Sequence, residues 1–174
     1  MTTPRPERVF LAVDAQNIWR YPIETYRAKI DYAKLKRYVL KRRPLFKAIA
    51  YFIDDPLKDQ ELFFTQLKKI GYDLKAKMAY RESGAFQNND WATSIIEDAI
   101  KYADQYDVFC LVSGRDTFAD SITSILNKRK KVEIYTWPEG FSSRLIVHAT
   151  EFDFLDDSCL MKDDLRTKNK GEEI

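Results

Sequence analysis

The chain of 174 residues is 45% hydrophobic and 32% charged, and its 29 basic and 27 acidic side chains leave a net charge of +2. This composition predicts one soluble globular domain, and the lack of any apolar run of about 18 residues excludes a membrane-spanning helix. With one histidine and five scattered glycines, the sequence excludes sites built from several imidazoles, Walker-type nucleotide hydrolysis and a glycine-rich dinucleotide loop.

Strands and helices are predicted to alternate along the first half of the chain. The expected strands are short apolar or alternating runs, and the expected helices repeat apolar residues at helical spacing. The first helix begins with a capping aspartate and stops before a proline, and the second meets a glycine at its C-terminal end. The pattern predicts strands at 9–13, 48–53 and 74–80, the last one half-exposed near a sheet edge, and helices at 31–43 and 59–70.

The same alternation continues in the second half. A uniformly apolar run is expected to form a central strand, and Asn88 or Asn89 is expected to cap the helix before it. The pattern predicts helices at 91–102, 118–126 and 141–148 and strands at 108–112, 132–137 and 152–155.

Together these elements predict an α/β fold, in which a mostly parallel, doubly wound sheet carries helices on both faces. We expect a single domain over residues 1–156 and a charged, flexible tail over 157–174. The polar N-terminus lacks a secretory signal, and two isolated cysteines do not make a disulfide framework, so we expect a cytoplasmic protein.

Polar side chains gather where the predicted strands end. Asp14 and Asn17 follow the first strand, Asp90 closes the polar loop after the third, and residues 113–116 follow the fourth. In an open parallel sheet, ligands bind beyond the carboxyl ends of the strands. Carboxylates that converge there are the oxygen ligands of Mg²⁺ or Mn²⁺, and a metal-activated water could hydrolyse a phosphodiester without any histidine.

Each of these residues also has a purely structural interpretation. Asp14 could end its strand and cap a turn, and Asp116 could cap a helix. Asp90 could interact favourably with the positive N-terminal end of the dipole of the helix that it opens. Two basic clusters, at 34–43 and 128–131, fit solvated helix ends better than a phosphate-contacting patch.

Three segments of the chain share the order and spacing of a known domain. The first segment, residues 10–18, is an apolar strand followed by Asp14, two further residues and Asn17. In the second segment, Asp90 opens a helix, and the strand after this helix ends in Ser-Gly at residues 113–114. Residues 137–154 then combine a serine-led helix with a short strand. Over residues 8–156, this arrangement resembles the NYN domain of the PIN-like nuclease superfamily, in particular LabA-like proteins.

The resemblance implies a Rossmann-like, PIN-like sheet of five to six strands and an acidic pocket that binds Mg²⁺ or Mn²⁺ and cuts RNA. Position by position, it assigns Asp14 as the first acid, Asn17 as the following amide and Asp90 as the acid that opens the third helix. On this basis the expected metal and catalytic residues are Asp14, Asp90 and Asp116, with Asn17 also catalytic, and the expected substrate contacts are Ser113, Arg115 and Ser143.

The chain departs from the family pattern after the fourth strand. The family commonly has Ser-Gly-Asp-x-Asp-Phe there, whereas Arg115 and Thr117 occupy the positions of the two acids in this chain. A further acid often found six residues after Asp90 falls on Ile96. We therefore expect Arg115 to pair with Asp14 or Asp90 in place of the metal, the alternative being that it points to solvent.

Two functions of different classes remain open. The first is a metal-dependent ribonuclease with a degenerate acidic site, which has RNA as its partner and needs neither a membrane nor a nucleotide cofactor. The alternative is a non-catalytic RNA- or partner-binding module that keeps the nuclease fold. A small-phosphate hydrolase at the same rim has only the fold in its favour.

Overall fold

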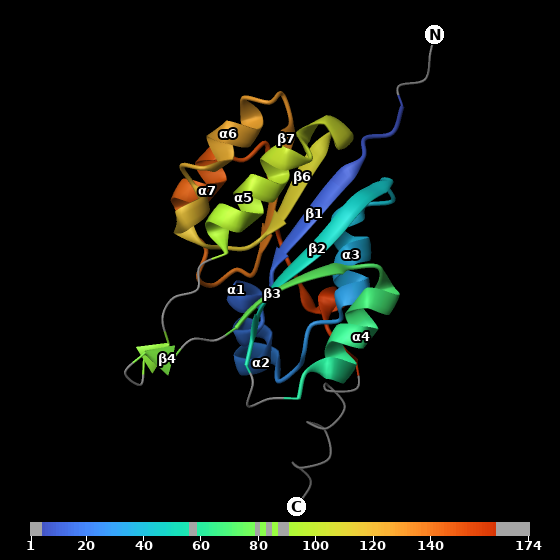
Figure 1. Ribbon diagram of the computed structural model, residues 1–174, viewed down its shortest axis with the longest axis vertical. Coiled ribbons are helices and arrows are strands. Elements are labelled where there is room, and N and C mark those ends of the chain that lie inside the picture. The colour runs from blue at the N-terminus through green and yellow to red at the C-terminus, as the bar shows by residue number, and fades with distance from the viewer. Residues whose placement is uncertain (1–4, 56–58, 79–80, 83–84, 87–90, 163–174) are drawn as a thin grey trace, which may run out of the picture.

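Six parallel strands form one sheet in the order β3-β2-β1-β6-β7-β8 (Figure 1). The computed structural model describes residues 5–55, 59–78, 81–82, 85–86 and 91–162. From β1 the chain passes outward to β3, returns to the middle as β6 and then runs to the opposite edge, so the order reverses between β1 and β6. The strands are β1 (Val9–Asp14), β2 (Leu45–Asp54), β3 (Asp73–Met78), β6 (Val108–Val112), β7 (Lys131–Thr136) and β8 (Glu151–Phe154).

Helices cover both faces of this sheet, which confirms the expected doubly wound α/β class (Figure 1). One face carries α3 (Tyr32–Leu40) and α4 (Glu61–Ile70), and the other carries α5 (Ala92–Lys101), α6 (Ile122–Leu126) and α7 (Ser143–His148). None of the described helices combines the length and the apolar character needed to cross a bilayer.

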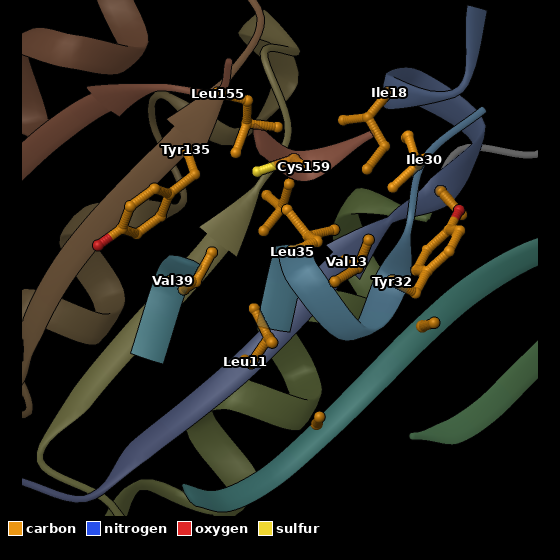
Figure 2. Packing of buried hydrophobic residues seen from close by; sticks show 14 of the residues in the cluster. Leu11, Val13, Ile18, Ile30, Tyr32, Leu35, Val39, Tyr135, Leu155 and Cys159 are labelled. Atoms are coloured by element: carbon orange, nitrogen blue, oxygen red, sulfur yellow. The ribbon is translucent and has the colours of Figure 1, made fainter. Parts of the chain in front are cut away.

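Alternate side chains of the central strands divide between two hydrophobic cores, as the two-residue period of a strand requires. Leu11 and Val13 of β1 pack under Leu35 and Val39 of α3 (Figure 2). Phe10 and Ala12 belong to the core beneath α5, α6 and α7. The apolar run at the start of the chain is therefore buried on both sides, which is typical of a central parallel strand.

Several boundaries differ from the sequence-based expectation. Asp31 caps α3 as expected, because its side chain accepts hydrogen bonds from the backbone N–H groups of the first turn. The helix ends at Leu40, however, because Lys41 and Arg42 adopt positive φ angles of 47° and 65°. The expected helix at 118–126 is a 3₁₀ turn followed by the shorter α6. Asn88 and Asn89, the expected caps of α5, lie outside the described residues.

The sequence patterns did not predict two sets of short elements. Two short helices, α1 (Ala15–Ile18) and α2 (Arg20–Tyr26), follow β1 directly. A two-stranded antiparallel hairpin, β4 (Arg81–Glu82) with β5 (Ala85–Phe86), forms part of the segment expected to be a loop. These elements are too short to carry a periodic signal.

The packed domain extends past Asp157, where the flexible tail was expected to begin. Cys159 (Figure 2) and Leu160 are fully buried, and Leu160 forms a β-bridge with Ile30. Lys34 of α3 donates a hydrogen bond from its ammonium group to the carbonyl oxygen of Leu160. The segment 157–160 thus closes the core beneath α3 despite its polar surroundings in the sequence.

Arg43 belongs to a basic cluster that was expected to face solvent, but it turns inward to a buried carboxylate. Its two terminal nitrogens lie 2.7 Å from the two oxygens of Glu133 on β7, whose side chain is almost fully buried. The hydroxyl of Tyr135 donates to the same carboxylate at 2.7 Å. Burial by itself raises the pKa of Glu133, but the hydrogen bonds from Arg43 and Tyr135 outweigh it, and the pKa is lowered.

Candidate functional site

Asp14 lies at the reversal of strand order, where ligands bind in doubly wound sheets. It is the last residue of β1, and only 1% of its surface is exposed. Ser113 follows β6 on the neighbouring strand, is fully buried and donates a hydrogen bond from Oγ to Oδ2 of Asp14 at 3.0 Å. The structure thus brings these two expected site residues together.

Asn17 joins the same group from α1. Its Oδ1 accepts a hydrogen bond from the backbone N–H of Gly114 at 2.8 Å, and Oγ of Ser113 lies 3.4 Å from the same oxygen. Both Asp14 and Asn17 were predicted from the sequence as site residues. Two residues separate them, so the turn of α1 places the Asn17 side chain beside the loop after β6. Asn17 therefore fixes the position of that loop relative to the buried acid.

Arg115 contacts Asp14, one of the two acids that the sequence offers as its partner. Its Nε lies 3.0 Å from Oδ2 of Asp14, and about a quarter of its side chain is exposed. The Nε–H is not aimed along this line, so the contact is a close ion pair rather than a well-formed hydrogen bond. The guanidinium offsets the cost of burying an ionised carboxylate.

Asp116 and Ser143 occupy a more exposed position than the buried group. The oxygens of Asp116 are bound by the hydroxyl of Ser142 at 2.6 Å and by Arg144 at 3.1 Å. The hydrogen bond from Ser142 has the largest effect on the pKa of Asp116, and it lowers this pKa together with the positive charge of Arg144. Ser143 is exposed at the start of α7. The sequence analysis missed Ser142 and Arg144, because nothing in the local pattern places α7 beside the loop after β6.

Two further acids, Asp90 and Asp98, are candidate members of the site. Asp90 lies outside the described residues. Asp98 of α5, which the sequence analysis had not assigned to the site, is buried and accepts a hydrogen bond from the hydroxyl of Tyr51 at 2.7 Å. Lys75 of β3 contacts both of its oxygens. Asp98 therefore anchors α5 to the sheet. Ile96, at the position of a family acid, belongs to the core.

The charges around Asp14 decide whether a divalent ion can bind there. Hard cations bind to several oxygen ligands. The Arg115 guanidinium, whose Nε lies 3.0 Å from Oδ2 of Asp14, would repel a cation bound at that oxygen. Within the described ranges, no three His, Cys, Asp or Glu side chains are grouped closely enough to hold a metal ion. With Arg115 in this position, the described residues do not fit a divalent ion at Asp14.

Gly114 allows two loops to meet at this rim. A Cβ atom there would lie 2.6 Å from Oγ1 of the buried Thr136 and 3.2 Å from the carbonyl oxygen of Gly140. Such overlap costs about 1–3 kcal/mol when the neighbours cannot move away freely. We expect Gly114→Ala to lower the free energy of unfolding by this amount, as measured by urea denaturation.

The matched control for this substitution is the double variant Gly114→Ala/Thr136→Ala, which removes the closest of the clashing atoms. We expect it to recover part of the loss through a favourable coupling energy in a double-mutant cycle. Additive losses would mean that the Thr136 side chain moves away from the added methyl group and that their close approach does not matter.

The chain is therefore an α/β protein with a doubly wound parallel sheet and a buried carboxylate at the switch point, the place where proteins of this class bind ligands. A family model described as the NYN domain matches residues 8–156, and the chain therefore belongs to the NYN family, a family of PIN-like nucleases. Nucleases of this family typically use divalent metal ions. Among curated protein sequences, none is similar enough to be matched.

One solved structure is similar over nearly the whole chain. It is the protein of unknown function VPA0982 from Vibrio parahaemolyticus, which is 29% identical with a TM-score of 0.81. The match covers 92% of this chain and 100% of VPA0982. A probable glycerol dehydrogenase from Sinorhizobium meliloti shares 17% identity, over 75% of this chain and 28% of its own, and its TM-score of 0.27 supports no conclusion.

Proposed function

We propose that the chain binds RNA at the rim formed by Asp14, Ser113 and Arg115, and that Arg115 contacts a backbone phosphate. The observation that carries this proposal is the ion pair between Nε of Arg115 and the buried Asp14 at 3.0 Å. It holds the guanidinium at the switch point, and no described residue accepts a hydrogen bond from its terminal nitrogens. Guanidinium groups recognise phosphate through paired N–H donors.

The second candidate function is hydrolysis of RNA phosphodiesters with Mg²⁺ or Mn²⁺. Membership in a nuclease family and the burial of Asp14 at the switch point support it. Asp14, Asp90 and Asp116 would be its acids, with Asn17 and Ser113 as positioning residues. In the described structure, Arg115 opposes this activity at Asp14, which makes RNA binding without efficient cleavage the better-supported function.

Fluorescence anisotropy with a labelled RNA tests binding. We expect wild-type binding to persist in EDTA, and Arg115→Gln to weaken it and to make the slope of log K against log salt shallower by about 0.7, because one phosphate contact is lost. Lys128→Gln, a cation away from the rim, is the matched control. Loss of all RNA binding in EDTA would contradict metal-free recognition by Arg115.

The same RNA, incubated with Mn²⁺ or Mg²⁺, tests cleavage. We expect slow cleavage or none by the wild type and none by Asp14→Asn, which keeps the size of the side chain but removes its charge. Equal cleavage by both proteins would indicate a contaminating nuclease. Rapid cleavage by the wild type that disappears in Asp14→Asn would favour the ribonuclease over the binding module.

A further inference from the structure

Three phenylalanine rings form a partly exposed cluster around the end of β8. Phe141 comes from the loop after β7, and Phe152 and Phe154 come from β8 itself; their ring centroids lie 4.9–5.9 Å apart. Phe141 is 36% exposed and Phe154 37% exposed, whereas Phe10 of β1 and Phe109 of β6 are fully buried. Exposed aromatic groups of this kind commonly mark a binding surface.

This aromatic cluster of Phe141, Phe152 and Phe154 adjoins the rim. The backbone N–H of Ser142 donates to the carbonyl oxygen of Gly114 at 3.2 Å, and the Cα of Phe141 is 3.3 Å from where a Cβ of Gly114 would lie. Gly114 directly precedes Arg115. Phe141 and Arg115 therefore project from two loops that touch each other.

The register of the sheet places Phe154 at the same rim. Phe154 pairs with Thr136 of β7, and Oγ1 of Thr136 lies 2.6 Å from the position of a Cβ on Gly114. Phe154 is the last residue of β8, and Phe141 lies beyond the carboxyl end of β7. Both exposed residues are therefore at the carboxyl edge of the sheet, where Asp14 and Arg115 also lie.

We propose that the aromatic cluster stacks unpaired nucleobases of an RNA strand whose phosphate contacts Arg115. This inference rests on the proposed RNA binding and adds to it a base-stacking site beside Arg115. Aromatic side chains next to a cationic backbone contact are the usual means of holding single strands, because every base offers a π-face. The bases of a duplex already stack on each other and cannot use such rings.

A second copy of this chain is the competing occupant of this surface, because β8 is an edge strand. Pairing two copies through β8 would bring Glu151 and Asp153 of one copy close to the same acids of the other, and like charges on paired strands destabilise the pairing. The contact between Phe141 and the Gly114 loop also ties the cluster to the rim rather than to the sheet edge alone.

Anisotropy titrations with a labelled single-stranded RNA test the proposal. We expect Phe141→Ala and Phe154→Ala to weaken binding about 5- to 100-fold each, the usual range for loss of one base–aromatic stack. The slope of log K against log salt stays unchanged in both, since no phosphate contact is lost. Val147→Ala, at a 78% exposed apolar position on α7, is the matched control and keeps wild-type affinity.

Two further variants separate stacking from packing. Phe141→Trp keeps a flat ring and is expected to retain binding, whereas Phe141→Leu keeps apolar bulk without a ring and is expected to lose about as much affinity as Phe141→Ala. Circular dichroism confirms that each variant is folded. If Phe141→Leu binds as tightly as the wild type, packing alone matters and the stacking proposal is overturned.

Other outcomes distinguish this inference from the proposed function. Tight RNA binding by the wild type, unchanged in both alanine variants, would overturn the stacking proposal and leave RNA binding at Arg115 intact. No RNA binding by the wild type would overturn both. Sedimentation that shows a dimer, converted to monomers by Phe154→Ala, would assign the cluster to a second copy of the chain.

Discussion

Replacing Arg115 with aspartate is expected to raise the affinity of the chain for Mn²⁺ by at least about tenfold and to produce or increase RNA cleavage. The change removes a positive charge 3.0 Å from Oδ2 of Asp14 and puts a carboxylate in its place. Two unit charges about 4 Å apart interact by about 4 kcal/mol at an effective dielectric constant of about 20, so reversing the sign has a large effect. Isothermal titration of Mn²⁺ into both proteins measures it.

A second, independent prediction for the same variant concerns its thermal stability. Without metal, Arg115→Asp leaves the buried Asp14 without its guanidinium and adds a like charge, which costs about 3 kcal/mol or more. For a chain of this size we expect the melting temperature to fall by about 6–12 °C. Mn²⁺ should restore part of this loss, because an ion that binds only the folded state stabilises it.

Arg115→Gln is the matched control, since it removes the cation without adding an acid. We expect it to raise Mn²⁺ affinity less than Arg115→Asp does. Equal Mn²⁺ affinity in the wild type and in Arg115→Asp would show that the guanidinium does not oppose a cation at Asp14. Equal melting temperatures without metal would show that the ion pair contributes little to the fold.

Glu133→Gln is expected to lower the free energy of unfolding at pH 7 by about 3–5 kcal/mol, because it leaves Arg43 charged and without its partner inside the protein. In the wild type, both terminal nitrogens of Arg43 lie 2.7 Å from the Glu133 oxygens, so removing one charge breaks a bidentate pair. The double variant Arg43→Met/Glu133→Leu is the control. It replaces the pair with apolar side chains, and we expect it to be more stable than Glu133→Gln.

The pH dependence of stability follows from the lowered pKa of Glu133. Hydrogen bonds from Arg43 and Tyr135 hold this pKa below its ordinary value of 4.5 in the folded state, against the opposing effect of burial. The unfolded chain therefore binds the proton first, and the stabilisation is fully present above pH 4.5 and is lost as the pH falls through the folded pKa.

Urea denaturation between pH 7 and pH 3 checks this dependence. The difference in stability between the wild type and Glu133→Gln should be constant at neutral pH and should shrink below about pH 4.5, because only the wild type loses the charge. A difference that does not change with pH would mean that the Glu133 carboxylate is not protonated on unfolding in this range.

The pattern of apolar residues is enough to predict the sheet and the residues at its rim. Each central strand is an apolar run whose alternate residues must be buried on both sides, and this pattern leaves a parallel sheet covered by helices as the stable arrangement. Residues at the ends of these runs then meet at one rim, which is why Asp14, Asn17 and Ser113 could be predicted together. The same logic places Arg115 at this rim, but it leaves Asp14 and Asp90 as alternative partners, and the ion pair with Asp14 is seen only in the structure.

The identity of the buried charged side chains and of the touching loops could not be predicted in this way, because it depends on how distant elements pack together. Arg43 and Glu133 are 90 residues apart, and no local pattern shows that a helix end would bring the one over the other. The contact of Phe141 with the Gly114 loop likewise depends on the path of the chain after β7. Periodicity reports the face that a residue occupies within its own element, whereas partners that are distant in sequence are set by how the elements pack.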